Sequence, residues 1–538
     1  MYICSLFKNQ NYIPLMNFAP LDIFVFVAYI VLIITVAMMV SRKKSGEEQT
    51  TRDYFLAGNT LPWWAIGTSL IAANISAEQL IGMTGDGFTV GLAVATYELM
   101  AAATLLVVAK FFLPIFLEKK IYSMPQFLDI RYDGRVRTMM AVLWLFLYVF
   151  VNLTSIMYLG AVCIKAVFGV PLVTAIVCIA VFSAIYTILG GLKAIAYTDF
   201  IQVAFLVVGG LITSYLALDS FSGGMGVVEG LSKLYNENQD HFKMIFSPSD
   251  EHYSYLPGLH MLFGAMWIIN LNYWGCNQYI TQRALAAKSL DEAQRGLIFA
   301  GFLKLLMPFI VVLPGIIAFA LHAPIDKQDE TYPWLLNTFL FPGVKGIAFA
   351  ALVAAVVGAL SSKTNSIATI FTMDIYKHFF GQNASEKHLV NVGRVSMALS
   401  LVIGVIVAPQ IENFGGGFKF IQEFTGFFSP GIFAIFIFGL FWKKATANAA
   451  FWVAILTLPV SLVFYFVPSL YEIPFIIRMG WVFLILSILM VVVSLSSKKE
   501  KDEKAIVFAP NLFKTSTIFN IGAIIIVVLL IVVYYRFW

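Results

Sequence analysis

Long apolar segments follow one another along almost the whole chain and are separated by short polar stretches. Fourteen of them are long enough to cross a bilayer as helices, because roughly 20 apolar residues span its hydrocarbon core. The predicted spans lie near residues 21–41, 62–85, 91–117, 138–167, 171–189, 196–217, 256–282, 296–321, 344–376, 391–410, 419–441, 446–466, 475–496 and 515–537. This pattern predicts an all-α polytopic membrane protein with 14 transmembrane helices. The polar stretch 218–255 is expected to be an external loop with a short helix at Val227 to Tyr235.

The second apolar segment carries polar residues in its middle, where a lipid-facing helix would have none. The run WWAIGTSLIAANISAEQLIGMTGDG places Asn74, Ser76, Glu78 and Gln79 at mid-membrane depth. Unsatisfied backbone groups are costly in lipid, so loosely helical polar sequence is tolerated there only where it lines a cavity. Many secondary transporters build their substrate and ion sites from such half-helices. The segment therefore favours a transporter.

A similar interruption occurs five spans later. The middle of 256–282 is rich in polar groups, among them Asn270, Asn272 and Tyr273. Two interrupted segments at corresponding positions predict a five-plus-five inverted repeat with the binding site between its halves. The chain is then a single transporter domain, 1–538, that comprises an N-terminal extra helix in 1–61, a first repeat in 62–217, a second repeat in 256–441 and C-terminal extra helices in 446–538.

Composition and charge exclude a soluble protein and suggest an orientation. The chain is 60% hydrophobic and only 12% charged, which no soluble domain of this size matches. Most of its 35 Lys and Arg residues lie in loops that are internal if the N-terminus is outside. We therefore expect a multi-pass protein of the plasma (inner) membrane with both termini outside. The lipid bilayer accounts for the basic residues, so no nucleic acid is expected. No obligate protein partner is expected either.

A few ionisable and amide side chains within the spans are candidates for ligand binding. Charged groups inside a membrane usually face a pathway or a partner, which applies to Glu98, Lys304 and Asp199. An ionised Glu only accepts hydrogen bonds and Lys only donates them, whereas Gln and Asn do both. Together with the aromatic face of Tyr273, the set formed by Glu98, Lys304, Gln79, Asn270 and Gln422 fits a neutral polyol. The alternative is that the amides and Tyr273 only join helices by hydrogen bonds.

Other chemistries lack their motifs. The chain contains no GxxxxGK[ST] phosphate loop, so ATP-driven transport has no motor. No Cys/His or His/Glu cluster has the spacing of metal ligands, and four cysteines are too few for a disulfide framework. With no nucleophile, metal or cofactor motif visible, we do not expect an enzyme.

Several long motifs make the chain recognisable. The segments DYFLAGNTLPWWAIGTSLIAANISAEQLIGMTGDG, NLNYWGCNQYITQRALAAKSLDEAQRG, NSIATIFTMDIYK and FIQEFTGFFSPGIFAIFIFGLFWKK resemble the sodium/solute symporter family. The resemblance is strongest to its sodium-sugar branch of sodium/glucose and sodium/galactose cotransporters, and it runs from about Leu21 to the C-terminus. It implies a LeuT-type core of ten helices in two inverted repeats. The implied function is secondary active transport of a hexose, galactose or glucose first, coupled to sodium by alternating access.

The resemblance also implies roles for individual residues. By matched position, the sugar contacts are Gln79, Glu98, Asn270, Lys304 and Gln422. Tyr273 would stack on the sugar ring as the inner gate, and the outer hydrophobic gate would be formed by Met83, Tyr97 and Phe418. A Ser expected one turn after Glu98 is Ala101 here. The loss of that hydroxyl is expected to relax or shift the sugar preference.

The implied sodium site departs further from the family pattern. Its backbone carbonyls would come from Ala72, Ile75 and Ala355, but Gly358 and Ala359 take the places of two Ser hydroxyl ligands. A small hard cation needs several oxygen ligands, so the loss of two should weaken binding.

Three explanations of the altered sodium site remain open. Ser361 and Ser362 replace the lost pair through a local shift, and sodium coupling survives. Alternatively, Lys363 places its ammonium group in the vacated site, which makes transport sodium-independent or proton-coupled. In the third case Lys363 only reaches the inner surface and the site is degenerate. We expect sodium coupling, with an uncoupled uniporter and a sugar sensor as the alternatives.

Overall fold

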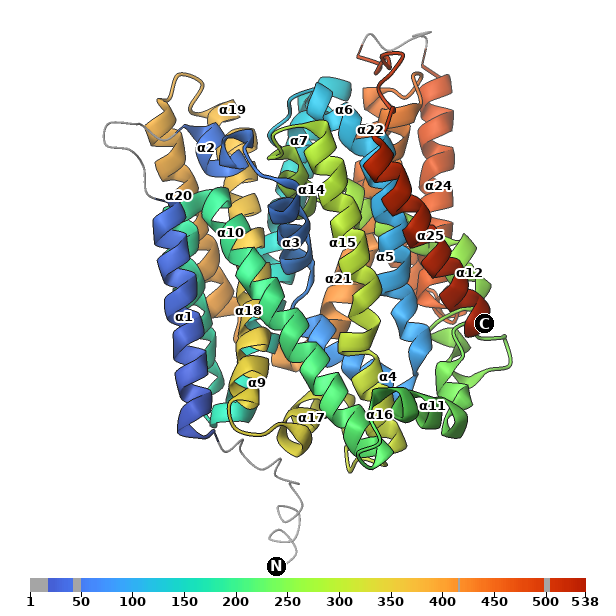
Figure 1. The fold of residues 1–538 in the computed structure, drawn as a ribbon. Coiled ribbons are helices and arrows are strands. Elements are labelled where there is room, and N and C mark those ends of the chain that lie inside the picture. The colour runs from blue at the N-terminus through green and yellow to red at the C-terminus, as the bar shows by residue number, and fades with distance from the viewer. Residues whose placement is uncertain (1–17, 42–49, 415–416, 498–503) are drawn as a thin grey trace, which may run out of the picture.

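The helices of this protein run alongside one another as a bundle, with short connecting helices at both ends (Figure 1). The computed structural model describes residues 18–41, 50–414, 417–497 and 504–538. Within these ranges, eleven helical segments are long and apolar enough to cross a membrane, and Leu172–Ile185 is a shorter apolar helix. The only β-type pairing there is a single bridge between Leu61 and Ala287. The predicted all-α membrane fold is therefore confirmed.

Most predicted spans correspond to one helix or to two consecutive helices. These are α1 Pro20–Ser41, α5 Thr96–Val107 with α6 Leu113–Glu118, α8 Gly134–Phe146 with α9 Thr154–Phe168, α15 Leu290–Val311 with α16 Leu313–Ala320, α18 Val344–Ile370, α20 Glu386–Val407, α21 Gly417–Phe441, α22 Ala447–Phe466, α24 Phe475–Leu495 and α25 Thr517–Arg536. Shorter helices connect them, namely α2 Thr51–Leu56, α7 Met124–Arg131, α11 Val227–Glu237, α17 Thr331–Phe339, α19 Lys377–Phe379 and α23 Pro468–Tyr471. Helix α11 confirms the short helix predicted in the loop 218–255.

The fifth and sixth predicted spans lie in one long element, α10 Leu172–Ser222. Its helical conformation is interrupted at Gly191, where φ is 59° and ψ is −163°. A Cβ atom at this position would lie 2.6 Å from the carbonyl oxygen of Tyr54. Both the left-handed backbone and the close approach require glycine, so this residue separates the two predicted spans.

The second predicted span is broken as its sequence indicated. Helix α3 Trp63–Asn74 ends at Ile75, whose backbone is extended with φ −76° and ψ 122°. The chain then continues through the π-helical turn η2 Glu78–Met83 and the short helix α4 Thr84–Thr89. At the break, the amide N–H of Ser76 donates to Oε1 of Gln79 at 2.9 Å. The side chain of Gln79 thus satisfies a backbone donor that the interrupted helix leaves exposed.

The segment 256–282 is interrupted in a comparable way. It forms α12 Leu259–Phe263, α13 Ala265–Leu271, the π-helical turn η8 Asn272–Cys276 and α14 Gln278–Leu285. Between the last two, Asn277 is extended, with φ −88° and ψ 126°. The hydroxyl of Tyr148 donates to Oδ1 of Asn277 and accepts from the amide N–H of Gln278. At each break a polar side chain, Gln79 or Tyr148, therefore satisfies a backbone donor within the bundle.

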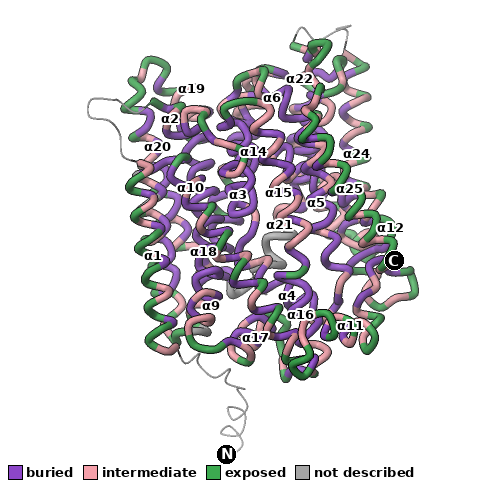
Figure 2. The backbone as a smooth tube through the Cα atoms, viewed as in Figure 1, coloured by how far each residue is buried: buried purple, intermediate pink, exposed green. Residues whose placement is uncertain are grey.

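Burial increases from the outer helices towards the centre of the bundle, as Figure 2 shows. The most apolar window of α18 is 83% buried inside the protein, whereas those of α1 and α25 are each 17% buried. Helix α10 packs against α18, and α15 packs against α3. The outer helices therefore present apolar side chains to lipid, while α18 and the broken segments form the interior.

Helices α7 and α8 each begin after a capping residue, at the end of the bundle where α2 lies. The hydroxyl of Ser123 accepts from the amide N–H of Gln126 at the start of α7. Asp133 accepts from the amides of Arg135 and Val136 at the start of α8, each at 3.1 Å. Although partial burial raises the pKa of Asp133, the Val136 amide and the Arg135 guanidinium lower it overall. The carboxylate therefore stays charged beside the positive end of the α8 dipole.

Candidate functional site

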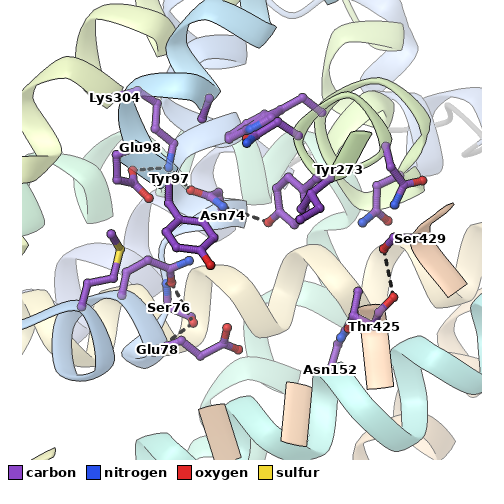
Figure 3. Close-up of a pocket in the computed structure, with 18 of the residues that line it drawn as sticks. Asn74, Ser76, Glu78, Tyr97, Glu98, Asn152, Tyr273, Lys304, Thr425 and Ser429 are labelled. Carbon is purple, nitrogen blue, oxygen red and sulfur yellow. Dashed lines mark hydrogen bonds and ion pairs between the residues drawn. The ribbon is translucent and has the colours of Figure 1, made fainter. Parts of the chain in front are cut away.

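A cavity lies between the two interrupted segments. The space inside it, including its opening to solvent, is about 1130 Å³. Its walls come from the α3–α4 break, α5, the turn η8, α15 and α18. Asn152 from the first half of the chain and Thr425 and Ser429 of α21 complete the lining (Figure 3). The breaks predicted in the sequence thus border one common site.

A buried ion pair forms part of the cavity wall. The ammonium group of Lys304 lies 2.5 Å from a carboxylate oxygen of Glu98, and the two residues are 1% and 4% exposed. Lys304 also donates a hydrogen bond to Oδ1 of Asn74, and its Nζ lies 5.3 Å from the ring centroid of Trp274. A charge buried without a partner would be strongly unfavourable. The pair can therefore keep an acceptor and a donor side by side in the membrane interior.

Asn74 connects this ion pair with Tyr273. Its Nδ2 donates to the hydroxyl of Tyr273 at 3.0 Å, while its Oδ1 accepts from Lys304 (Figure 3). The ring of Tyr273 packs edge-on against Trp274 and Tyr279, with centroid distances of 5.2 and 5.8 Å. One chain of hydrogen bonds therefore joins α15, the end of α3 and η8, and it fixes the orientation of the aromatic ring.

The structure brings most of the predicted site residues together. The cavity is lined by Gln79, Met83, Tyr97, Glu98, Ala101, Asn270, Tyr273 and Lys304. The side chains of Phe418 and Gln422 lie outside the described residues, although α21 carries their backbone. Sequence reasoning missed Asn152, Tyr279 and Ser429, which also line the cavity. The signal for Asn152 was available, since it is an amide within the apolar run YVFVNLTSIMY.

Two of the positions implied for sodium meet in space. Ala72 lies in the last turn of α3, and Gly358 lies on α18 next to it. A Cβ atom added to Gly358 would be 3.2 Å from the carbonyl oxygen of Ala72. Ile75 at the break, together with Ala355 and Ala359 on α18, is buried. The carbonyls at the end of α3 carry the negative end of its dipole, which suits a cation.

The two serines that could replace the missing hydroxyl ligands are engaged within their own helix. The hydroxyl groups of Ser361 and Ser362 donate to the carbonyl oxygen of Gly358 at 3.0 and 2.7 Å. Arg283 in addition donates to the hydroxyl of Ser362. The hydroxyl oxygen of Ser362 is thus already held by a cationic group.

Lys363 lies in the cavity wall and not at the inner surface. It is 5% exposed, and its ammonium group is 4.3 Å from the ring centroid of Tyr279. It lines the same cavity as Glu78, with which it interacts electrostatically. A second positive and a second negative side chain therefore face the cavity beside the pair Glu98–Lys304.

Asp199 takes part in a buried network next to the cavity. Its carboxylate accepts from the hydroxyl of Ser69 at 2.5 Å, and Ser69 accepts from Nε of Arg283 at 3.1 Å. Asp199 and Arg283 are both 0% exposed. Because the network joins α10, α3 and α14, it holds the first half-helix against its neighbours.

Known proteins resemble this chain over most of its length. The family model for sodium:solute symporters matches residues 54–457. A sodium/glucose cotransporter of Vibrio parahaemolyticus is 46% identical over 96% of this chain and 98% of its own length. The human sodium/myo-inositol cotransporter 2 is 35% identical over 82% of this chain and 69% of its own length.

A solved structure has the same fold. The substrate-bound, outward-open structure of a sodium-coupled sialic acid symporter superposes with a TM-score of 0.77. It covers 89% of this chain and 98% of its own, at 21% identity. The family match, the curated relatives and the shared fold agree with the cavity between two broken helices. The chain therefore belongs to the sodium:solute symporter family and is a solute transporter, not an enzyme.

Proposed function

We propose that this protein takes up a hexose, with galactose or glucose as the first candidates. Sodium that moves down its gradient drives this uptake. The observation that carries this proposal is the pair Glu98–Lys304 facing a cavity beside the ring of Tyr273. Neighbouring hydroxyls of a sugar each need a donor and an acceptor, and a carboxylate next to an ammonium group provides both. The relatives named for glucose and myo-inositol point to the same class of neutral polyhydroxylated solute.

The proposed architecture contains 14 spans around a five-plus-five core. The eleven long apolar helices and the shorter helix Leu172–Ile185 account for twelve of them. The interrupted segments α3–α4 and α12–α14 would be the remaining two, because each of their helices is too short to cross a bilayer on its own. In this proposal both termini lie outside the plasma membrane, and the two broken segments occupy corresponding positions in the inverted repeats.

Sodium would act by stabilising the broken segment. A cation between the end of α3 and α18 is attracted by the Ala72 and Ile75 carbonyls, and it would order the break that also carries Asn74 and Gln79. The sugar contacts are then preformed. Such coupling is a shift of population, and it is only as large as the difference in sodium affinity between the states. Release inward would require the hydrogen bond between Asn74 and Tyr273 to open.

A second candidate function is sodium-independent sugar transport. The specific observation in its favour is the buried ammonium group of Lys363, which faces the cavity together with Glu78. Since Gly358 and Ala359 bring no side-chain oxygen, a tethered cation would supply the charge that sodium brings in other members. Transport would then no longer depend on the sodium gradient.

Uptake of radiolabelled galactose into proteoliposomes tests both candidates. We expect accumulation above equilibrium with an inward sodium gradient, and none when potassium replaces sodium. Equal uptake in both buffers would contradict sodium coupling. A loss of that uptake in Lys363→Met would then assign it to the tethered cation. Galactose binding without uptake would instead indicate a sensor, and uptake without accumulation a uniporter.

A further inference from the structure

Gly358 is closely covered by a side chain from another helix. A Cβ atom at this position would lie 2.5 Å from Oε1 of Gln202, nearer than non-bonded atoms approach. Gln202 lies on α10 and is 2% exposed. Its carboxamide oxygen therefore occupies the space that a side chain at position 358 would need.

The same point is close to a backbone oxygen of α3. The carbonyl oxygen of Ala72 lies 3.2 Å from the position of the added Cβ. Oxygen atoms from α3 and α10 thus converge on one buried spot beside α18. A hard cation is bound by neutral oxygens of this kind, and a carboxamide oxygen has two lone pairs for this purpose.

The neighbouring network keeps α10 in this position. Asp199 precedes Gln202 by three residues, so both side chains lie on the same face of the helix. Asp199 accepts from Ser69 of α3, and Ser69 precedes Ala72 by the same interval. The contact between Asp199 and Ser69 therefore aligns Gln202 with the end of α3.

We propose that Gln202 supplies a side-chain oxygen to the transported sodium ion, in place of the hydroxyl group that Gly358 lacks. The inference rests on the sodium coupling of the proposed function, and it names the residue that makes the coupling possible. It explains how the site keeps a side-chain ligand although Gly358 and Ala359 contribute none. It also explains why position 358 is glycine, because a larger residue would displace the amide.

Binding of ²²Na⁺ to the purified full-length protein tests this assignment without transport. We expect Gln202→Ala to weaken sodium affinity about tenfold or more, which corresponds to a loss of about 1.4 kcal/mol in binding free energy. The matched control is Gln294→Ala, since Gln294 is also 2% exposed but donates to the carbonyl oxygen of Ala109 at 3.1 Å. The control should bind sodium like the wild type. Unchanged affinity in Gln202→Ala would overturn the inference.

A reciprocal exchange separates a sodium ligand from a purely structural glutamine. Gly358→Ser alone should lose affinity, because its Cβ meets the Gln202 amide. Adding Gln202→Ala to it removes the obstacle and restores a hydroxyl group, so sodium affinity should recover at least threefold relative to Gln202→Ala. Failure of the double variant to recover any affinity would contradict the proposal.

Two further variants keep the test decisive if Gln202→Ala does not fold. Gln202→Glu keeps an oxygen and Gln202→Met has a similar length without one, so sodium affinity should be retained in the first and reduced in the second. Equal affinities would overturn the inference. Binding of ³H-galactose, measured in parallel, distinguishes the two proposals. Sodium binding without galactose binding would refute the proposed sugar, whereas a wild type that binds no sodium would refute the role of Gln202.

Discussion

Asn74 uses both ends of its amide within the cavity. It accepts from Lys304 and donates to Tyr273, which connects the charged pair with the aromatic ring. An Asp at this position could no longer donate to the tyrosine hydroxyl, and an Ala could do neither. At the scale of single residues, the site therefore depends on groups with both donor and acceptor capacity. The hydroxyl groups of the sugar have to replace these hydrogen bonds or add to them.

Ala101 provides a gain-of-function prediction at this scale. It lines the cavity one turn after Glu98, so Ala101→Ser places a hydroxyl group next to the charged pair. One additional hydrogen bond contributes about 0.5–1.5 kcal/mol, and the apparent affinity for galactose should rise about two- to tenfold. The concentration dependence of galactose uptake measures this change. Ala102→Ser is the control, because Ala102 is fully buried on α5 and does not line the cavity; equal effects of the two variants would contradict the prediction.

Close contact between backbones holds α4, the second half of the first broken segment. A Cβ atom at Gly315 of α16 would lie 2.1 Å from the carbonyl oxygen of Thr84, and one at Gly87 of α4 would lie 2.5 Å from that of Val312. Small residues permit such approach between membrane helices. At the scale of elements, α4 is therefore fixed to α16, while the break at Ile75 keeps an extended backbone.

Gly315→Ala should accordingly destabilise the protein. The added methyl group meets backbone atoms that cannot rotate away, and overpacking of this kind costs about 1–3 kcal/mol. We expect a lower melting temperature in detergent. Gly134→Ala is the matched control, because nothing lies within 4 Å of its added Cβ at the start of α8. Its melting temperature should stay the same or rise slightly, and an equal loss in both variants would disprove the argument from backbone contact.

The whole molecule has two distinct ends. The carbonyl oxygen of Phe537 accepts from the amide of Met244, and Arg536 donates to the hydroxyl of Tyr235. The end of α25 therefore lies beside α11 and the loop after it. Helices α2, α7 and α19 lie at the opposite end of the bundle (Figure 1). This arrangement agrees with the proposed orientation, in which the loop 218–255 and the C-terminus share the external side.

Thiol labelling of whole cells tests the proposed orientation. In a variant without the four native cysteines, Met225→Cys after α10 should react with a membrane-impermeant maleimide. Gln382→Cys after α19 should react only after the cells are permeabilised. Both positions are exposed in the structure, so access to the thiol is limited by the membrane alone. The reverse pattern would place the termini inside.

The sequence by itself determined the features that depend on local chemistry. The spans follow from the length of the apolar runs. The breaks follow from polar residues such as Ser76 within these runs, because an unsatisfied backbone group in lipid is costly regardless of which helices are neighbours. Glu98 and Lys304 were recognisable as candidate site residues, since a charge in a span needs a partner. These inferences require no knowledge of which helices are neighbours.

Only the tertiary structure decided which of these groups meet. Glu98 and Lys304 are 206 residues apart, and Asn74 and Tyr273 are 199 apart, so their pairing results from the packing of distant helices. The direction of Lys363 towards Tyr279 could not be derived either, because a lysine in a span can equally extend to the surface. Gln202 is an amide within a predicted span, but the sequence does not show which group it meets. Its relation to Gly358 exists only because α10 and α18 pack closely enough for one side chain to fill the space that the other leaves.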